Sequence, residues 1–187
     1  MAEPIAAYAQ LNARIMPADR GERFEDPLGE ALEEQGLGEV SGGGTMQEAD
    51  GETEYCGIDV DLVDLERGVP LVCELLTRCG APKGSKLTYE LDGEQVEVPF
   101  GAAEGLAIYL NGTDLPDEVY ATSDINVICD EMDALLGDAG EIQGYWQGPR
   151  ETALYMYGRS YDEMAAHLAK LLEVTPLCQR ARVVRIA

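Results

Sequence analysis

The sequence predicts an α+β fold built from two tandem ferredoxin-like βαββαβ units, each an antiparallel sheet with helices on one face. Segments with alternating apolar residues, typical of strands, are interleaved with segments whose apolar residues recur at helical spacing. The order of these segments over residues 1–100 is β-α-β-β-α-β with one appended strand. The same order recurs over residues 101–187, as in a duplicated unit. A chain of 187 residues is long enough for two small domains.

Five segments of the first half are expected to be strands, four from a strand-like pattern and the second, which is glycine-rich, as an extended segment. They are Ile5–Met16, Leu37–Gln47, Thr53–Asp64, Ser85–Leu91 and Gln95–Phe100. In the third segment, the alternation places Cys56, Ile58, Val60 and Leu62 toward the core and Glu54, Asp59 and Asp61 toward solvent. Asp50-Gly51 and Asp92-Gly93 are turn signals, so we expect hairpins at both positions.

Two helices are predicted between these strands. Asp26 is a candidate N-cap with Pro27 at the first helical position, and Gly36 is a C-terminal stop. The second helix is expected from about Val69 to Cys79, where a glycine and a proline follow.

The second half shows the same order of patterns. Strands are expected at Leu106–Leu110, Glu141–Gln147, Glu151–Tyr157 and Arg182–Ala187. One helix is predicted after Ser123 or Asp124 as N-cap, and another after the capping box Ser160-x-x-Glu163.

Two short echoes also link the halves. Gly38-Glu39-Val40 corresponds to Gly140-Glu141-Ile142, and Glu52–Tyr55 resembles Glu151–Tyr155. We therefore expect one domain over residues 1–100 and a second over residues 101–187, with the boundary near Pro99–Glu104.

Charge excludes several classes of function. The chain has 36 acidic and 13 basic residues, a formal net charge of −23 and a pI near 4.1. Such a chain is repelled by nucleic-acid phosphates and by anionic lipid, so we expect neither nucleic-acid nor membrane binding. Residues 1–100 hold 22 acids and 7 bases, a net of −15, whereas residues 101–187 hold 14 acids and 6 bases, a net of −8.

Two acidic clusters account for much of the excess in the first half. One follows the predicted first helix and comprises Glu22, Glu25, Asp26, Glu30, Glu33 and Glu34. The other covers the predicted hairpin and comprises Glu48, Asp50, Glu52, Glu54, Asp59, Asp61, Asp64 and Glu66. They are interpreted either as a solvated surface or as a docking face for a basic protein. For the docking face, the candidate contact residues are Glu30, Glu33, Glu34, Glu54, Asp59 and Asp61.

The second half contains an aromatic group, Tyr145, Trp146, Tyr155, Tyr157 and Tyr161. Tyr155 and Tyr157 share one strand face, with Tyr145 or Trp146 on the neighbouring strand. The group is interpreted either as a partner-binding patch, for which Tyr145 and Trp146 are candidates, or as cross-strand packing.

No catalytic set is evident in the sequence. His167 is the single histidine, and the five cysteines lack the spacing of a zinc site. We therefore expect no catalytic residues, no metal and no cofactor. The odd number of cysteines favours reduced thiols and a cytoplasmic protein. The sequence shows neither a signal peptide nor a membrane-spanning segment.

Three consecutive glycines, Gly42–Gly44, form the most unusual local feature. A phosphate-binding loop would end in Gly-Lys-Ser/Thr and precede a helix, and this segment does neither. We interpret the glycines as a β-bulge or a close packing contact.

In overall character the chain resembles acidic bacterial immunity and inhibitor proteins, and Gly38–Thr45 and Pro176–Gln179 read like motifs of an uncharacterised bacterial family. The resemblance implies a non-enzymatic module that neutralises a basic partner such as a toxin. A small-molecule sensor or enzyme with a pocket between the repeats, near the glycines and Tyr145-Trp146, is the alternative hypothesis. The chain is expected to be a monomer or a homodimer.

Overall fold

A computed structural model of the chain describes residues 4–187, which divide into two compact units. The first comprises residues up to Glu48 together with Thr53–Ala103, and the second comprises Ala49–Glu52 and Glu104–Ala187. The main boundary therefore lies three residues beyond the predicted one, inside the interval from Pro99 to Glu104. The assignment of Ala49–Glu52 to the second unit has no counterpart in the sequence pattern.

The first unit contains a five-stranded antiparallel sheet in the order β2-β3-β1-β4-β5. Its strands are β1 (Ile5–Leu11), β2 (Gly38–Gln47), β3 (Thr53–Leu62), β4 (Ser85–Leu91) and β5 (Glu94–Phe100). Leaving out β5, the order 2-3-1-4 is that of a ferredoxin-like βαββαβ unit. The predicted unit with one appended strand is confirmed.

The first helical segment is longer than the sequence indicated. It runs through α1 (Pro17–Arg20), a π-helical turn (Gly21–Glu25) and α2 (Asp26–Gln35). Asp26 as N-cap is thus a wrong prediction, because Pro17 occupies the first turn and Pro27 lies inside the helical run. The wide π turn ends at Glu25, two residues before Pro27, which cannot donate a backbone hydrogen bond.

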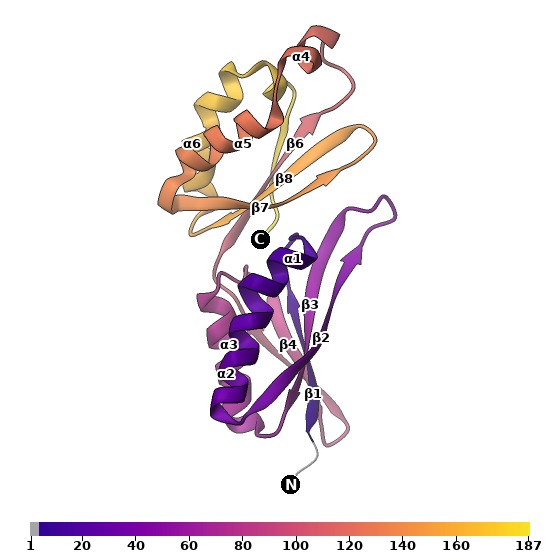
Figure 1. The fold of residues 1–187 in the computed structure, drawn as a ribbon, viewed down its shortest axis with the longest axis vertical. Helices are drawn as coiled ribbons and strands as arrows, with labels where there is room; N and C mark the ends of the chain where they lie inside the picture. Colours follow the sequence, from indigo (N-terminus) through magenta and orange to yellow (C-terminus); the bar gives the residue numbers. More distant parts are fainter. Residues whose placement is uncertain (1–3) are drawn as a thin grey trace. The chain divides into compact units, whose positions relative to one another are not determined.

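The second helix, α3 (Leu65–Arg78), also begins earlier than predicted. The Asp64 side chain caps it by accepting a hydrogen bond from the Arg67 N–H at 3.2 Å. Pro70 suggested a later start, but the helix continues through it. Helices α2 and α3 cover one face of the sheet (Figure 1), and Phe24, Leu28, Leu32, Ile58, Val60, Leu62, Val72 and Leu76 form the core beneath them.

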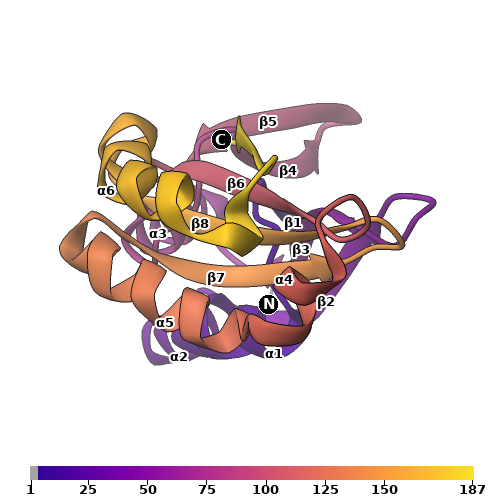
Figure 2. The same ribbon diagram turned by 90° about the horizontal axis from the view of Figure 1, so that it is seen from above.

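The second unit has the same topology with a sheet ordered β7-β8-β6-β9. Its elements are β6 (Glu104–Asn111), α4 (Asp117–Thr122), α5 (Ile125–Leu136), a 3-10 turn (Gly137–Ala139), β7 (Gly140–Gln147), β8 (Glu151–Gly158), α6 (Tyr161–Val174), a 3-10 turn (Pro176–Cys178) and β9 (Arg182–Arg185). Asp124 and Ser160 cap α5 and α6, as predicted. Figure 2 shows both helices in front of the sheet. The short α4 has no buried residue and gave no sequence signal.

A shared bulge supports the equivalence of the two units. The pairing register slips between Val40 and Gly42 on β2 and between Ile142 and Gly144 on β7. The first echo therefore marks corresponding strands with an irregularity at the same step. The second echo is out of register, because Tyr55 pairs with Met46 on β2 whereas Tyr155 pairs with Gly144 on β7.

A buried ion pair explains the central glycine of the run, Gly43. Arg20 is only 7% exposed and donates to Glu25 Oε1, to the Gly44 carbonyl at 2.9 Å and to Thr45 Oγ1 at 3.1 Å. A Cβ atom on Gly43 would lie 2.5 Å from Glu25 Oε1 and 3.0 Å from Arg20 Nη2. The bulge and the close contact both occur here, which confirms the interpretation made from the sequence.

This packing predicts different outcomes at neighbouring glycines. Gly43→Ala should lower the free energy of unfolding by about 1–3 kcal/mol, because the added methyl group displaces the Arg20–Glu25 pair. Gly44→Ala is the matched control, since a Cβ there meets nothing within 4 Å, and its effect should stay within about 0.5 kcal/mol. Urea unfolding of both variants provides the measurement, and equal effects would contradict the account.

Candidate protein-binding surfaces

The face of the first sheet that carries no helix, here called the helix-free face, is acidic. Asp59 is exposed and Asp61 is partly exposed on this face, as the alternation of β3 predicted. The register adds Glu39 of β2, which lies directly opposite Asp61. The sequence alone does not show which residue of β2 lies opposite Asp61, so Glu39 was not predicted as a contact residue.

Asp59 extends toward the outer strand of the sheet. It pairs with Gly42 of β2, and a Cβ on Gly42 would lie 3.1 Å from Asp59 Oδ2. The missing side chain thus leaves space that the carboxylate occupies. The glycine run makes room on both faces, for the Arg20–Glu25 pair on the helical side and for Asp59 on the other.

Tyr8 is a second residue of the helix-free face that the sequence analysis did not single out. It pairs with Asp59 from β1, and its side chain crosses Gly57, where a Cβ would lie 2.0 Å from the Tyr8 hydroxyl oxygen. Burial, followed by the nearby Tyr55 and Asp59, raises the pKa of Tyr8. The phenol is therefore a neutral hydrogen-bond donor beside the carboxylates.

One basic residue of this face, Lys86, already forms an ion pair. Lys86 of β4 donates to Glu97 Oε1 of β5 at 2.7 Å. The remaining carboxylates on the face keep their net negative charge, and a ligand that pairs with them must be cationic.

The acidic helix lies on the other side of the sheet. Glu30, Glu33 and Glu34 are exposed on α2, as expected, and none of them forms an ion pair within residues 4–187. Because α2 and Asp59 occupy opposite faces of the sheet, the structure does not merge the two predicted clusters into one flat surface.

Glu54 differs from the other strand acids. It is exposed, but the β2–β3 register slips here, with Met46 opposite Tyr55 and Gln47 opposite Thr53. Glu54 therefore has no residue opposite it on β2 at this bulge near the start of β3. Five positions separate it from Asp59, so strict alternation could not have placed both on one face.

The corresponding face of the second unit is aromatic and buried. Tyr155 and Tyr157 of β8 are 0% and 2% exposed. The hydroxyl groups of Tyr109 and Tyr155 both donate to Glu52 Oε1, at 2.6 and 2.8 Å. Trp146 pairs with Ala153 on this face, whereas Tyr145 points to the opposite side and is 57% exposed. The predicted pair Tyr145-Trp146 is therefore divided between two faces.

Equivalent positions in the two sheets are occupied by aspartates in the first unit and by tyrosines in the second. The residue that pairs with the glycine after the bulge is Asp59 in the first unit and Tyr155 in the second. Two residues further on, Asp61 corresponds to Tyr157. Because one topology accepts both sets, the fold itself does not require the carboxylates of the first unit.

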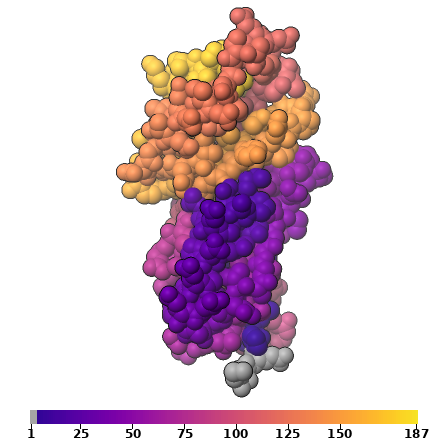
Figure 3. Space-filling view, viewed as in Figure 1, coloured from indigo at the N-terminus to yellow at the C-terminus, as the bar shows by residue number. Residues whose placement is uncertain are grey.

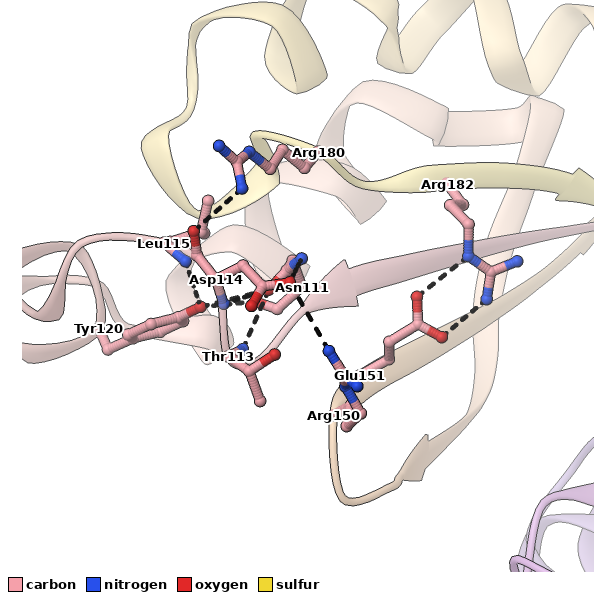
Figure 4. Close-up of polar contacts among 9 residues, drawn as sticks. All are labelled: Asn111, Thr113, Asp114, Leu115, Tyr120, Arg150, Glu151, Arg180 and Arg182. Atoms are coloured by element: carbon pink, nitrogen blue, oxygen red, sulfur yellow. Dashed lines mark hydrogen bonds and ion pairs between the residues drawn. The ribbon is translucent and has the colours of Figure 1, made fainter.

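One end of the second unit gathers arginines, all of which have polar contacts (Figure 4). Arg182 makes two hydrogen bonds to Glu151, at 3.0 and 2.7 Å, and these lower the pKa of Glu151. Arg150 lies 3.9 Å from Asp114, and Arg180 donates to the Asp114 carbonyl at 3.3 Å. These contacts hold together strand ends and a loop, which indicates a structural role.

The same loop is organised by its own side chains (Figure 4). Asn111 Oδ1 accepts from the N–H groups of Thr113 and Asp114, at 3.0 and 2.7 Å. The Tyr120 hydroxyl accepts from the Leu115 N–H at 2.9 Å. These hydrogen bonds hold the loop after β6 in place.

The single histidine and the potential metal ligands do not form a cluster in the part of the chain that the structure describes. His167 is exposed, and its Nδ1 lies 2.7 Å from the Leu135 carbonyl oxygen, so this nitrogen is the donor. Residues 4–187 include no group of three or more histidine, cysteine or acidic side chains arranged to hold a metal ion. Within this range no helix is both long and apolar enough to span a membrane.

Comparisons with known proteins assign no family. No protein-family model and no curated protein matches the chain. A putative monooxygenase from Lactobacillus acidophilus NCFM has 13% identity and a TM-score of 0.33, covering 100% of this chain and 95% of its own. An unknown protein from Galdieria sulphuraria has 13% identity and a TM-score of 0.29, covering 98% and 96%.

A third solved structure, a complex of TiaS with a tRNA, AMPCPP and agmatine, has 12% identity and a TM-score of 0.35, with 97% of this chain and 59% of that chain covered. The chain thus spans less than two thirds of that protein. These low TM-scores carry no argument about activity, and the fold assignment rests on the strand order itself.

The cysteines supply a prediction about accessibility. All five are free thiols, and burial raises the pKa of Cys56 from 9.0 to about 12. In the folded protein at pH 8, iodoacetamide should therefore modify the partly exposed Cys79 and Cys129 before Cys56. In urea all five should react at similar rates, as followed by mass spectrometry. Early modification of Cys56 in the folded protein would contradict the described packing.

Proposed function

We propose that this protein is a non-enzymatic module that binds a basic protein through the carboxylates of its first unit. The observation that carries the proposal is the exposed Asp59 and partly exposed Asp61 on the helix-free face, at positions where the second unit has tyrosines. Exposed like charges repel one another, and a partner rich in lysine and arginine relieves that repulsion.

The resemblance to immunity and inhibitor proteins suggests what the partner is, namely a basic enzyme that this protein inhibits. An acidic protein can neutralise a basic enzyme such as a nuclease toxin by covering the cationic surface that the enzyme uses. Association of this kind is fast and is weakened by salt, because long-range attraction steers the encounter. The five free thiols fit a reducing cytoplasm as the place of action.

Charge reversal distinguishes the helix-free face from the acidic helix. A partner is first captured from source cells at low ionic strength, purified, and titrated against variants by calorimetry. Asp59→Lys/Asp61→Lys should weaken binding by about 100-fold, because each substitution replaces an attraction with a repulsion. Glu30→Lys/Glu33→Lys/Glu34→Lys should have a smaller effect, since α2 lies across the sheet.

The control places the same charge change on α5 of the second unit. Asp130→Lys and Glu131→Lys are both at exposed positions there, and together they should change the affinity by less than about threefold. Thermal unfolding of each variant verifies that it is folded, and Asp59→Asn/Asp61→Asn serves as a milder variant. Binding that is independent of salt, or equally affected by the α5 control, would show that the proposal is wrong.

A further inference from the structure

Strand β2 is an open edge of the first sheet. It lies outermost, pairs only with β3 in the described sheet, and is mostly exposed over its 10 residues. Edge strands present unpaired N–H and C=O groups, and natural proteins usually protect them with charges or proline. The opposite edge, β5, has that protection in Glu94, Glu97 and Pro99, whereas Val40–Gln47 contains neither a charge nor a proline.

The backbone of β2 is largely unused outside the β2–β3 pairing. The Gly44 carbonyl accepts a hydrogen bond from Arg20, which lies on the helical side. Apart from the sheet ladder, no backbone–backbone hydrogen bond within residues 4–187 involves Glu39–Gln47. Alternate N–H groups along this edge are therefore available to another extended chain.

Carboxylates flank the edge on its helical side. A Cβ on Gly29 would lie 3.9 Å from the Val40 side chain, so Gly29 marks the side of α2 that faces β2. At about 100° per residue, Asp26 and Glu33 lie within roughly 60° of Gly29 around the helix, and both are exposed. Figure 3 shows the helical segment in indigo and β2 in violet on the visible surface.

The other side of the edge is also acidic. Glu39 is exposed on β2 itself, and Asp59 Oδ2 lies beside the position that a Gly42 side chain would fill. An additional strand next to β2 would point alternate side chains to opposite faces. One set would approach Asp26 and Glu33, and the other would approach Glu39 and Asp59.

From this juxtaposition we propose that β2 accepts an extended lysine- or arginine-bearing segment of the partner as an additional strand of the sheet. The inference rests on the proposed function and specifies how the partner binds. Backbone hydrogen bonds supply the pairing, and the flanking carboxylates select cationic side chains. A second copy of this chain is a poor occupant, because the carboxylates that flank the two edges would meet and the net charge of each copy is −23.

The test uses the full-length protein and three synthetic octapeptides. One alternates lysine with threonine, the second has the same sequence with every backbone nitrogen after the first methylated, and the third alternates glutamate with threonine. Methylation keeps the charge and removes the backbone donors, so it separates strand addition from simple attraction. Affinity is measured by calorimetry at low salt, and protection of the β2 amides by hydrogen exchange with NMR detection.

The unmodified lysine peptide should bind and should protect alternate amides between Val40 and Gln47. Methylation should weaken binding at least tenfold, and the glutamate peptide should not bind. Glu39→Gln/Asp59→Asn should weaken binding about tenfold, whereas Asp130→Asn/Glu131→Gln on α5 should change it by less than about twofold. Melting curves of both double variants verify that they are folded.

Each contrary result overturns the inference in a recognisable way. Equal binding of the methylated peptide, with unprotected β2 amides, would overturn strand addition while leaving charge-based docking intact. Absence of lysine-peptide binding would overturn this occupant, and the charge-reversal titration with the captured partner would still decide the proposed function. Protected β2 amides in a peptide-free dimer, detected by sedimentation, would assign the edge to a second copy.

Discussion

One buried interaction joins the first helical segment to the outer strand of the first unit, namely the ion pair between Arg20 and Glu25 beside Gly43 of β2. A buried guanidinium requires a carboxylate and hydrogen-bond acceptors, and Glu25, the Gly44 carbonyl and Thr45 provide them. A side chain at Gly43 would displace the pair, because its Cβ would lie 2.5 Å from Glu25 Oε1. The same contact requires a glycine at position 43, in the part of the outer strand that carries neither a charge nor a proline.

The two units show how one topology can present different surfaces. Both have the strand order 2-3-1-4 and a bulge at the same step of the outer strand. In the second unit the helix-free face contains tyrosines, of which Tyr155 donates a hydrogen bond to Glu52. In the first unit Asp59 occupies the position that corresponds to Tyr155. The shared topology does not require those acids, and their exposure on one face is the basis of the proposed binding role.

Alternation and turn chemistry were enough to predict the fold. The inward set of β3 and the caps at Asp124 and Ser160 follow from local rules, and the structure confirms them. The start of the first helix was wrong because Pro27 fits either a first turn or the interior after a π turn, and only packing decides between them. The arrangement of the acidic face could not be predicted, because it follows from how β2 and β3 are aligned. No local pattern shows that Glu39 lies opposite Asp61 or that the Asp59 carboxylate lies beside Gly42.

The most direct test of the central claim is NMR mapping of the captured partner on the full-length, isotope-labelled protein at low and at physiological salt. The account predicts that the largest chemical-shift changes lie at Gly42–Thr45 of β2 and around Asp59 of β3, and that they diminish as salt is raised. Changes confined to the second unit, or a complex that does not respond to salt, would contradict it.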